Sequence, residues 1–337
     1  MFLSVIVPIY NGQTYLRQCL DSLLAQDIPA REYEIVCVND GSRDGSGEIL
    51  REYGDRFSNV IVIEQENAGV AAARNTGLKQ ARGAYVWFVD ADDFVQHNIL
   101  GKMRATVEAE NCDRLVFGAY QFADELTPEE VNLASTGGLS VNAPWYDAVV
   151  WRSLLKRSFL EENQLFFRYP QITHGEDGLF MYEVARCQKS CVEMGEILYF
   201  YRVHSGSAET ERSPEHLRKM LRSHMAVTKI LADYYAGGSK DSMTANKLTA
   251  FLWNTLYEIT QLPSKERRNA LRDLAQQGLF PYQRPAACTM LCSYVTDRND
   301  WIGKGFDWLY RHLHTRWGFA LMTVLQQLRR LAANVRR

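Results

Sequence analysis

The chain has 337 residues, of which 46% are hydrophobic and 23% charged, and its formal net charge is −2 at pH 7. This length predicts two structural units, and this composition is that of a globular protein with a substantial core. The near-neutral charge gives no indication of nucleic-acid binding, and no apolar stretch reaches the ~18 residues of a membrane-spanning helix. The apolar run at the N-terminus has no basic residues before it and is interrupted at Asn11-Gly12, so we expect a first strand rather than a signal peptide. We therefore expect a cytoplasmic protein, at most peripheral on the inner face of the membrane.

The first ~120 residues alternate short apolar runs with helical spacing, which predicts an α/β fold with a mostly parallel sheet flanked by helices. Leu3 to Ile9 is almost continuously apolar, as expected of a strand buried on both faces. The pattern predicts strands over 3–9, 33–38, 60–63 and 85–89, and helices over 15–24, 46–53 and 69–79.

The second half of the chain becomes increasingly helical. The segment 126–140 is polar, and we then expect a helix over 177–186 and a strand over 198–203. The chain from Pro214 onward has a helical pattern throughout, including a helix bounded by Ser264 and Gly278. We place the domain boundary near Ser213-Pro214, which predicts a catalytic unit over 1–213 and a helical C-terminal region over 214–337.

Polar and glycine residues gather where each of the first four expected strands ends. Ligands bind outside the carboxyl ends of strands in open α/β sheets, so we expect one ligand site built from several loops. The four clusters are Tyr10-Asn11-Gly12, Asp40-Gly41-Ser42, Glu66-Asn67-Ala68-Gly69 and Asp90-Ala91-Asp92-Asp93.

The D-x-D sequence Asp90-Ala91-Asp92 directly follows an apolar strand. Two carboxylates in such a turn can bind a hard divalent cation that keeps coordination sites for phosphate oxygens. Such an ion stabilises the charge that develops on a departing nucleoside diphosphate. A solvated acidic turn is the alternative for a D-x-D sequence taken alone.

These segments, taken together and in this order, resemble the inverting family 2 glycosyltransferases, which have the GT-A fold. The resemblance is strong over residues 1 to about 100 and thinner to about 210. The matching segments are Val5 to Asn11, Val38 to Ser42, Asn67 to Gly77 and Phe88 to Asp93.

The resemblance implies a role for each matching position in binding the donor. Pro8 and Tyr10 would frame the nucleobase, and Asp40 would hydrogen-bond it. Asn67, Gly69 and Arg74 would line the nucleotide, although Arg74 could instead pair with an acid. Asp90, with Ala91 beside it, would contact the ribose or the sugar, and Asp92 would ligate Mg²⁺ or Mn²⁺.

The segment His174-Gly175-Glu176-Asp177 supplies candidates for a general base. Direct displacement at a sugar carbon needs a group that takes the proton of the acceptor hydroxyl. The resemblance assigns this role to Asp177, with Glu176 as the alternative. Acids also favour a helix N-terminus for purely electrostatic reasons.

The segment Tyr201 to Ser207 resembles a polar loop that closes over the diphosphate in the family. Arg202 would then contact phosphate. His204 is a candidate second metal ligand, and an ordinary loop residue is the other interpretation.

The last residues of the chain predict a basic amphipathic helix, whose apolar stripe suits a membrane surface, the catalytic unit or a second subunit equally. The stripe consists of Trp317, Leu321, Val324, Leu328, Leu331 and Val335.

Seven cysteines without C-x-x-C spacing predict free thiols. The pairs Cys187/Cys191 and Cys288/Cys292 are four residues apart, a spacing that would make each pair stacked neighbours if it lay on a helix.

The sequence therefore predicts an inverting, metal-dependent glycosyltransferase. It would move a hexose or N-acetylhexosamine from a UDP-sugar to a glycan or lipid-linked acceptor in bacterial surface polysaccharide synthesis. A nucleotidyltransferase is one alternative, but no basic residue follows the first strand before Arg17. A non-catalytic nucleotide-sugar-binding scaffold is another alternative. A dehydrogenase is disfavoured because no G-x-G-x-x-G follows the first strand.

Overall fold

The protein, described by a computed structural model, divides into two compact units, Met1–Glu211 and Arg212–Arg337. The structure describes residues 1–123, 126, 131, 149–168, 172–204, 213–237 and 241–276. The division falls close to the expected boundary at Ser213-Pro214.

The first unit is built on one eight-stranded sheet with the order β3-β2-β1-β4-β7-β6-β8-β5. The run β3-β2-β1-β4 is parallel throughout, β6 and β8 are also parallel, and β7 and β5 pair antiparallel with their neighbours. This arrangement confirms the predicted α/β class. The strands are β1 (Leu3–Ile9), β2 (Tyr33–Asp40), β3 (Val60–Gln65), β4 (Tyr85–Phe88), β5 (Phe94–Val95), β6 (Arg114–Ala123), β7 (Ser153–Lys156) and β8 (Cys191–Val203).

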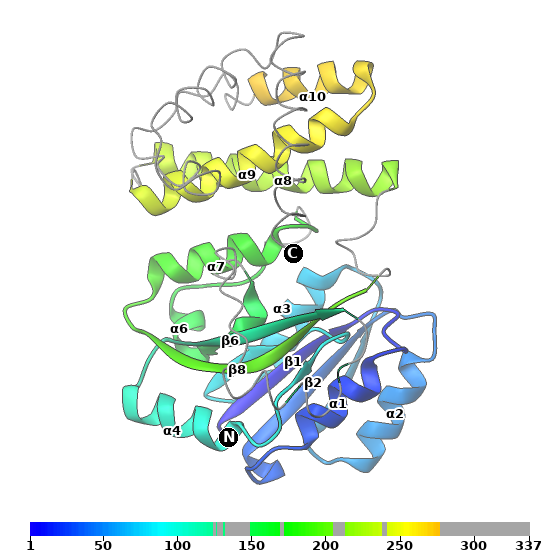
Figure 1. Cartoon of the computed structure of the whole chain (residues 1–337), viewed down its shortest axis with the longest axis vertical. Helices are drawn as coiled ribbons and strands as arrows, with labels where there is room; N and C mark the ends of the chain where they lie inside the picture. The colour runs from blue at the N-terminus through cyan, green and yellow to red at the C-terminus, as the bar shows by residue number, and fades with distance from the viewer. Residues whose placement is uncertain are drawn as a thin grey trace. The chain divides into compact units, whose positions relative to one another are not determined.

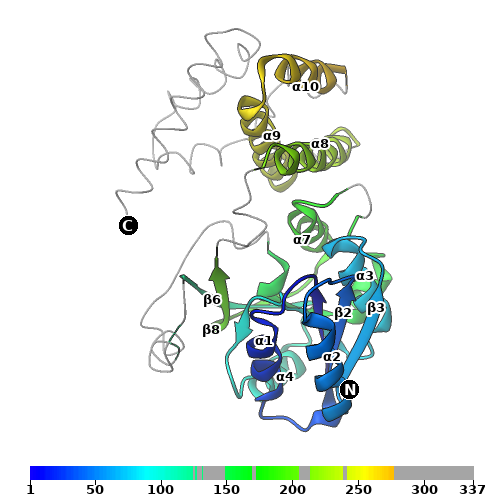
Figure 2. The same ribbon diagram turned by 90° about the vertical axis from the view of Figure 1, so that its right-hand side faces the viewer.

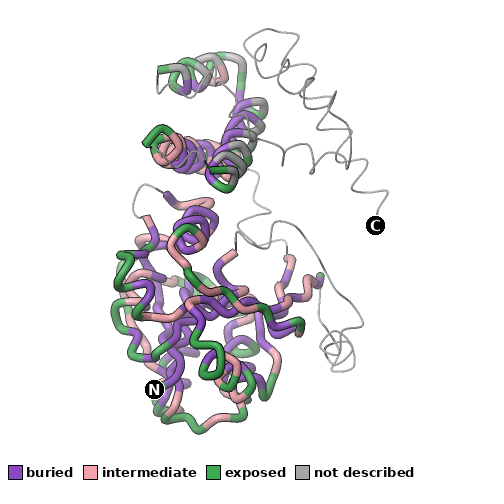
Figure 3. The backbone as a smooth tube through the Cα atoms, turned by 90° about the vertical axis from the view of Figure 1, so that its left-hand side faces the viewer, coloured by how far each residue is buried: buried purple, intermediate pink, exposed green. Residues whose placement is uncertain are grey.

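Helices cover both faces of this sheet (Figures 1 and 2). Side chains alternate between the faces along a strand, so Val5 and Val7 of β1 pack with α1, α2 and α4, whereas Ile6 packs with α3, α6 and α7. The central strands β1, β2 and β4 are therefore buried along their whole length, and β1 and β4 are apolar almost throughout (Figure 3). The helices are α1 (Leu16–Leu24), α2 (Ser46–Arg56), α3 (Val70–Gln80), α4 (Leu100–Glu110), α6 (Arg157–Glu162) and α7 (Glu176–Cys187).

Small residues bring α3 close to the sheet. A Cβ atom on Gly77 would lie 2.4 Å from Cγ2 of Ile6, which is closer than carbon atoms can approach without displacement. Ala71 and Ala73 on the same helix are also buried against this face. The small side chains thus allow α3 to pack directly on β1, and α3 carries Arg74 to the edge of the sheet.

Three helices form the described part of the second unit: α8 (Pro214–Ala236), α9 (Ser242–Gln261) and α10 (Ser264–Gln276). Ser213 caps α8, where its hydroxyl accepts a hydrogen bond from the His216 amide, and Pro214 opens the helix. The predicted helical character of the chain after Pro214 holds as far as Gln276. The stripe from Trp317 to Val335 and the pair Cys288/Cys292 lie outside the described residues. Of the helices formed by the described residues, none has the length and apolar character needed to cross a bilayer.

Cys187 and Cys191 do not share a helix. Cys187 is the last residue of α7, whereas Cys191 is the first residue of β8, because the chain turns between them. The cysteines within the described residues are all free, and Cys19, Cys37 and Cys112 are buried.

Candidate functional site

The loops that follow β1 and β2 are joined by hydrogen bonds at the carboxyl edge of the sheet. Tyr10, at the start of the first loop, keeps a 52% exposed side chain, whereas Pro8 is buried within β1. The exposed ring of Tyr10 therefore lies next to two loops that hold each other in place. The hydrogen bonds are Asn11 N to Ser42 Oγ (3.0 Å), Gly12 N to Ser46 Oγ (3.0 Å), Gln13 N to Asp44 Oδ2 (3.0 Å) and Arg43 N to Asn11 Oδ1 (2.8 Å).

Asp40 ties the loop after β3 to this edge. Its carboxylate accepts hydrogen bonds from the amides of Ala68 and Gly69, both at 2.8 Å, and from the side chain of Gln65 at 2.7 Å. Asn67 donates to the Asp40 carbonyl at 2.9 Å, and Gly69 takes a φ of +90°, which favours glycine, before α3 begins. The base contact of Asp40 and the nucleotide contacts of Asn67 and Gly69 stay predictions.

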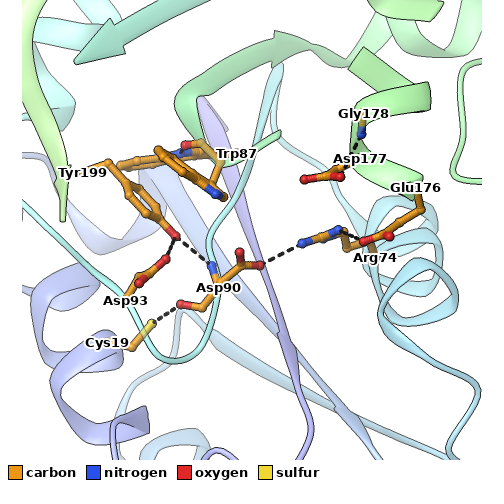
Figure 4. Close-up of polar contacts among 10 residues, drawn as sticks. Cys19, Arg74, Trp87, Asp90, Asp93, Glu176, Asp177, Gly178 and Tyr199 are labelled. Carbon is orange, nitrogen blue, oxygen red and sulfur yellow. Dashed lines mark hydrogen bonds and ion pairs between the residues drawn. The ribbon is translucent and has the colours of Figure 1, made fainter. Parts of the chain in front are cut away.

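The D-x-D loop is held through the backbone of Asp90 (Figure 4). The Asp90 amide donates to the Tyr199 hydroxyl at 3.1 Å, and this hydroxyl donates to Asp93 Oδ2 at 2.6 Å. The Cys19 thiol contacts the Asp90 carbonyl at 3.6 Å, and the amide of Arg202 donates to Asp93 Oδ1 at 2.7 Å. Burial and the neighbouring carboxylates raise the pKa of Asp93 well above its ordinary value. Asp93 therefore serves as an internal support of the loop, and its carboxylate faces protein groups.

Asp92 and His204 converge from two distant segments, with 3.0 Å between Asp92 Oδ2 and His204 Nε2. Their side chains remain 37% and 21% exposed, whereas Ala91 between the two aspartates is buried. Burial, followed by the charge of Asp90, raises the pKa of Asp92, and a cation would offset both effects.

The donor set here suits a hard divalent ion that also binds a diphosphate. One carboxylate and one imidazole leave the remaining positions to phosphate oxygens and water. Mg²⁺ in phosphate-transfer sites is held by one or two carboxylates together with substrate phosphates, whereas an imidazole is a ligand more typical of transition-metal ions. Within the described residues, no group of three or more His, Cys, Asp or Glu side chains is placed to hold a metal ion. The protein thus offers Asp92 and His204, and any further oxygen ligands would come from the substrate and water.

Arg202 is buried and directed at protein groups. Its Nε donates to the Asp92 carbonyl at 3.0 Å, and a terminal nitrogen bonds the side chain of Gln18. Its guanidinium also stacks over Tyr15 at 4.4 Å from the ring centre. In this structure Arg202 supports the D-x-D loop, and its predicted phosphate contact stays a prediction.

Arg74 links the D-x-D loop to the start of α7. Its Nη2 lies 2.9 Å from Asp90 Oδ1, and its Nη1 lies 2.9 Å from Glu176 Oε1 (Figure 4). The three residues come from α3, the end of the parallel sheet and α7. From the sequence, Arg74 could either line the nucleotide or pair with an acid. In the structure it forms ion pairs with two acids.

Asp177 occupies the second position of α7 beside this ion pair. Its Oδ1 accepts a hydrogen bond from the Gly178 amide at 2.7 Å. Burial first, and then the charge of Glu176, raises the pKa of Asp177 to about 7, while Arg74 lowers it. A carboxyl group with such a pKa exchanges its proton near neutral pH, as a general base must.

The structure therefore connects Arg74, Asp90 and Glu176 by direct contacts and brings Asp92 next to His204. Sequence reasoning gave no role to Asp93 or Tyr199. A third acid directly after D-x-D was the available signal for Asp93. The signal for Tyr199 was weaker, because a tyrosine in an apolar strand indicates only that its hydroxyl requires a partner.

Comparison with known proteins identifies the family. The model of glycosyl transferase family 2 matches residues 4–185. The uncharacterized glycosyltransferase EpsJ of Bacillus subtilis is 34% identical over 241 residues, which cover 66% of this chain and 68% of EpsJ. The poly(ribitol-phosphate) beta-N-acetylglucosaminyltransferase TarS of Staphylococcus aureus is 28% identical over 262 residues, 74% of this chain and 44% of TarS.

Solved structures show the same fold. The crystal structure of S. aureus TarS 1–349 in complex with UDP-GlcNAc has a TM-score of 0.63 at 23% identity, covering 82% of this chain and 81% of that chain. The mannosyltransferase PcManGT from Pyrobaculum calidifontis, in complex with GDP-Man and Mn²⁺, has a TM-score of 0.51 at 17% identity, with 96% and 86% covered. The sheet and its flanking helices form a GT-A fold, as the resemblance of the motifs implied, and this chain belongs to glycosyltransferase family 2.

Proposed function

We propose that the protein transfers a sugar from a UDP-sugar to an acceptor hydroxyl, with inversion at the anomeric carbon and with Asp177 as the general base. The observation that carries this proposal is the contrast between the two acids at the start of α7. Glu176 is paired with Arg74, whereas Asp177 has no ion pair among the contacts described here and has a pKa raised to about 7. Asp177 can therefore accept a proton near neutral pH, while the side chain of Glu176 is already engaged by Arg74.

The proposed step is a single displacement. The acceptor oxygen forms a bond to the anomeric carbon while Asp177 takes the hydroxyl proton. The bond from the anomeric carbon to the diphosphate oxygen breaks at the same time, and its electron pair leaves with UDP. Attack from the face opposite the leaving group inverts the configuration, and one base suffices because no covalent sugar–enzyme intermediate forms.

Asp92 and His204 would hold Mg²⁺ or Mn²⁺ at the diphosphate. When bound there, such an ion supplies positive charge against the charge that develops on the departing diphosphate. The arrangement of one carboxylate and one imidazole, both partly exposed and 3.0 Å apart, supports this assignment. The Mn²⁺ in the mannosyltransferase of similar fold is consistent with it.

Two relatives support the proposed donor class. TarS, which shares the fold, was crystallised with UDP-GlcNAc, and TarS is named a beta-N-acetylglucosaminyltransferase. We therefore propose a hexose or N-acetylhexosamine as the transferred sugar. A glycan or a lipid-linked saccharide of a bacterial surface polysaccharide is the proposed acceptor. The family match favours transfer over the nucleotidyltransferase alternative.

A donor panel tests this proposal without knowledge of the acceptor. Slow hydrolysis of UDP-Glc, UDP-Gal, UDP-GlcNAc and GDP-Man is measured with Mn²⁺, for the wild type and for Asp177→Asn. We expect one UDP-sugar to be hydrolysed fastest, and a loss of roughly 10²- to 10⁴-fold in the variant. The variant should still bind UDP, and Asp55→Asn, which changes an exposed acid on α2, serves as the matched control. Wild-type turnover by Asp177→Asn, or hydrolysis of GDP-Man alone, contradicts the proposal.

A further inference from the structure

Arg74 is a buried arginine that lies between two acidic side chains. Its side chain is only 5% exposed, and its two terminal nitrogens each face a carboxylate at 2.9 Å. The ring of Phe167 lies 5.3 Å from the guanidinium carbon, and Nε is buried with no hydrogen-bond partner. A phosphate or ribose could reach this guanidinium only by displacing Asp90 or Glu176.

The two acids belong to opposite parts of the proposed site. Asp90 begins the D-x-D loop, whose backbone is held by Tyr199 and Cys19. Glu176 is the first residue of α7 and immediately precedes Asp177. A single planar group with parallel donors bridges them, and a planar fork suits two carboxylates better than the point charge of a lysine would.

We propose that Arg74 is a positioning residue, not a nucleotide ligand, and that it fastens the first turn of α7 to the D-x-D loop so that Asp177 stands at a defined place relative to the donor. The inference rests on the proposed function, in which Asp177 is the base. Arg74 acts through Glu176 and Asp90 and does not touch the reacting atoms.

This arrangement has an electrostatic consequence that a purely steric role would lack. The charged groups facing Asp177 are Glu176 on its own helix, Arg74 from α3 and Asp90 from the loop after β4. Glu176 and Asp90 raise the pKa of Asp177, whereas Arg74 lowers it. Removing the arginine charge should therefore move the pKa of the base upward, and removing the Glu176 charge should move it downward.

The test compares Arg74→Met, Arg74→Lys and Glu176→Gln with the wild type, using hydrolysis of UDP-GlcNAc with Mn²⁺ between pH 5 and 9. Arg17→Met removes an arginine from an exposed ion pair with Glu52 and is the matched control. UDP binding with Mn²⁺ is measured for each variant by calorimetry. In Arg74→Met we expect kcat to fall by roughly 10- to 100-fold, because the base loses its support. The KM for the donor and the Kd for UDP should change less than about threefold, because Arg74 does not bind the donor in this proposal.

The pH profile gives the decisive sign. The rising limb should move to higher pH in Arg74→Met and to lower pH in Glu176→Gln. In Arg74→Lys the rising limb should lie near its wild-type position, because the positive charge is kept. The kcat of this variant should stay reduced, because an ammonium group lacks the planar pair of donors that bridges the two carboxylates. A merely structural contribution would not shift the two profiles in opposite directions.

Two results would overturn the inference. One is an increase of tenfold or more in KM and in the Kd for UDP with an unchanged kcat and pH profile, which would make Arg74 a donor ligand. The other is a Glu176→Gln profile that coincides with the wild type, and this result decides the matter even if Arg74→Met does not fold. Asp177→Asn is measured alongside. The turnover of Asp177→Asn tests the base itself. If this variant is inactive but the pH profiles of the Arg74 and Glu176 variants do not move, the result contradicts only the role of Arg74.

Discussion

Asp92 Oδ2 and His204 Nε2 lie 3.0 Å apart although 112 positions separate the two residues in the chain. Asp92 follows the last strand of the parallel run β3-β2-β1-β4, whereas His204 follows β8, so the fold brings the two side chains together. In the protein alone the two side chains bond each other. A divalent cation would replace this bond with two coordinate bonds.

Metal removal should therefore weaken nucleotide binding. We expect Asp92→Ala to raise the Kd for UDP in the presence of Mn²⁺ by roughly tenfold or more, with His204→Ala giving a smaller rise. EDTA should weaken UDP binding by the wild type and have little further effect on Asp92→Ala. Calorimetric titration measures this, with Asp55→Ala as the control at an exposed acid. UDP binding that changes neither with EDTA nor with Asp92→Ala would exclude metal binding at this site.

The rate should rise with pH through about 7. The pKa of Asp177 is raised to about 7 by burial and by Glu176, and only the ionised carboxylate can accept a proton from the acceptor. The plot of log kcat/KM against pH should therefore rise with unit slope below pH 7 and level off above it. Steady-state rates between pH 5 and 9 measure this limb, and a flat profile down to pH 5 would contradict Asp177 as the base.

Asp177→Asn should stabilise the fold at alkaline pH while it removes activity. Because the pKa of Asp177 is higher in the folded than in the unfolded chain, its contribution to stability is present below about pH 4 and is lost as the pH rises to about 7. An uncharged isostere avoids this loss. Urea unfolding of wild type and variant at pH 4 and pH 8 should show an advantage of the variant that grows with pH. A variant that is less stable at pH 8 would contradict this.

Tyr199→Phe should disturb the D-x-D loop. Loss of the hydroxyl leaves the Asp90 amide and the Asp93 carboxyl without this partner, at a cost of roughly 1–3 kcal/mol in stability. The Kd for UDP with Mn²⁺ should also rise, since Asp92 belongs to the same loop. Tyr85→Phe removes a buried hydroxyl bonded to the Cys112 carbonyl, far along the same sheet from the loop, and should lower stability without changing UDP binding. Equal UDP affinities in both variants would show that Tyr199 contributes only to folding.

Gly77→Ala should destabilise the first unit by roughly 1–3 kcal/mol, because its new methyl group would overlap Ile6. Gly195→Ala on β8 is the matched control, since a Cβ atom there meets nothing within 4 Å. Urea midpoints of the two variants compare the costs. A Gly77→Ala midpoint equal to that of Gly195→Ala would mean that α3 moves freely away from β1.

The sequence predicted the parallel part of the sheet well because each of its strands is an apolar run with a polar cluster at its end. The polar clusters that contain Asp40, Gly69 and Asp90 predicted a ligand site at the carboxyl edge of these strands. The other half of the sheet, β7-β6-β8-β5, was missed except for the strand expected over 198–203, which lies within β8. β5 has two residues, and β6 pairs with β8 across a long stretch of intervening chain, so local periodicity contains no record of either pairing.

Long-range contacts also explain what the sequence left open at the site. Arg74 is the same residue type whether it binds phosphate or a carboxylate, and only the approach of Glu176, 102 positions away, distinguishes the two. The roles of Asp93 and Tyr199 likewise depend on a contact across 106 positions. Residue type and spacing thus identified which groups gather at the edge of the sheet, and the pairing among them emerged from the tertiary structure.

The crossed hydrogen bonds between the loops after β1 and β2 have a thermodynamic consequence for the donor. Asn11, Gln13, Ser42 and Asp44 already hold both loops in the protein alone. A nucleobase that stacks on Tyr10 would not have to order these segments, so little conformational entropy would be lost when it binds. The same hydrogen bonds couple the conformations of the two loops. A substitution at Asn11 or Asp44 therefore alters the shape of the neighbouring loop as well as its own.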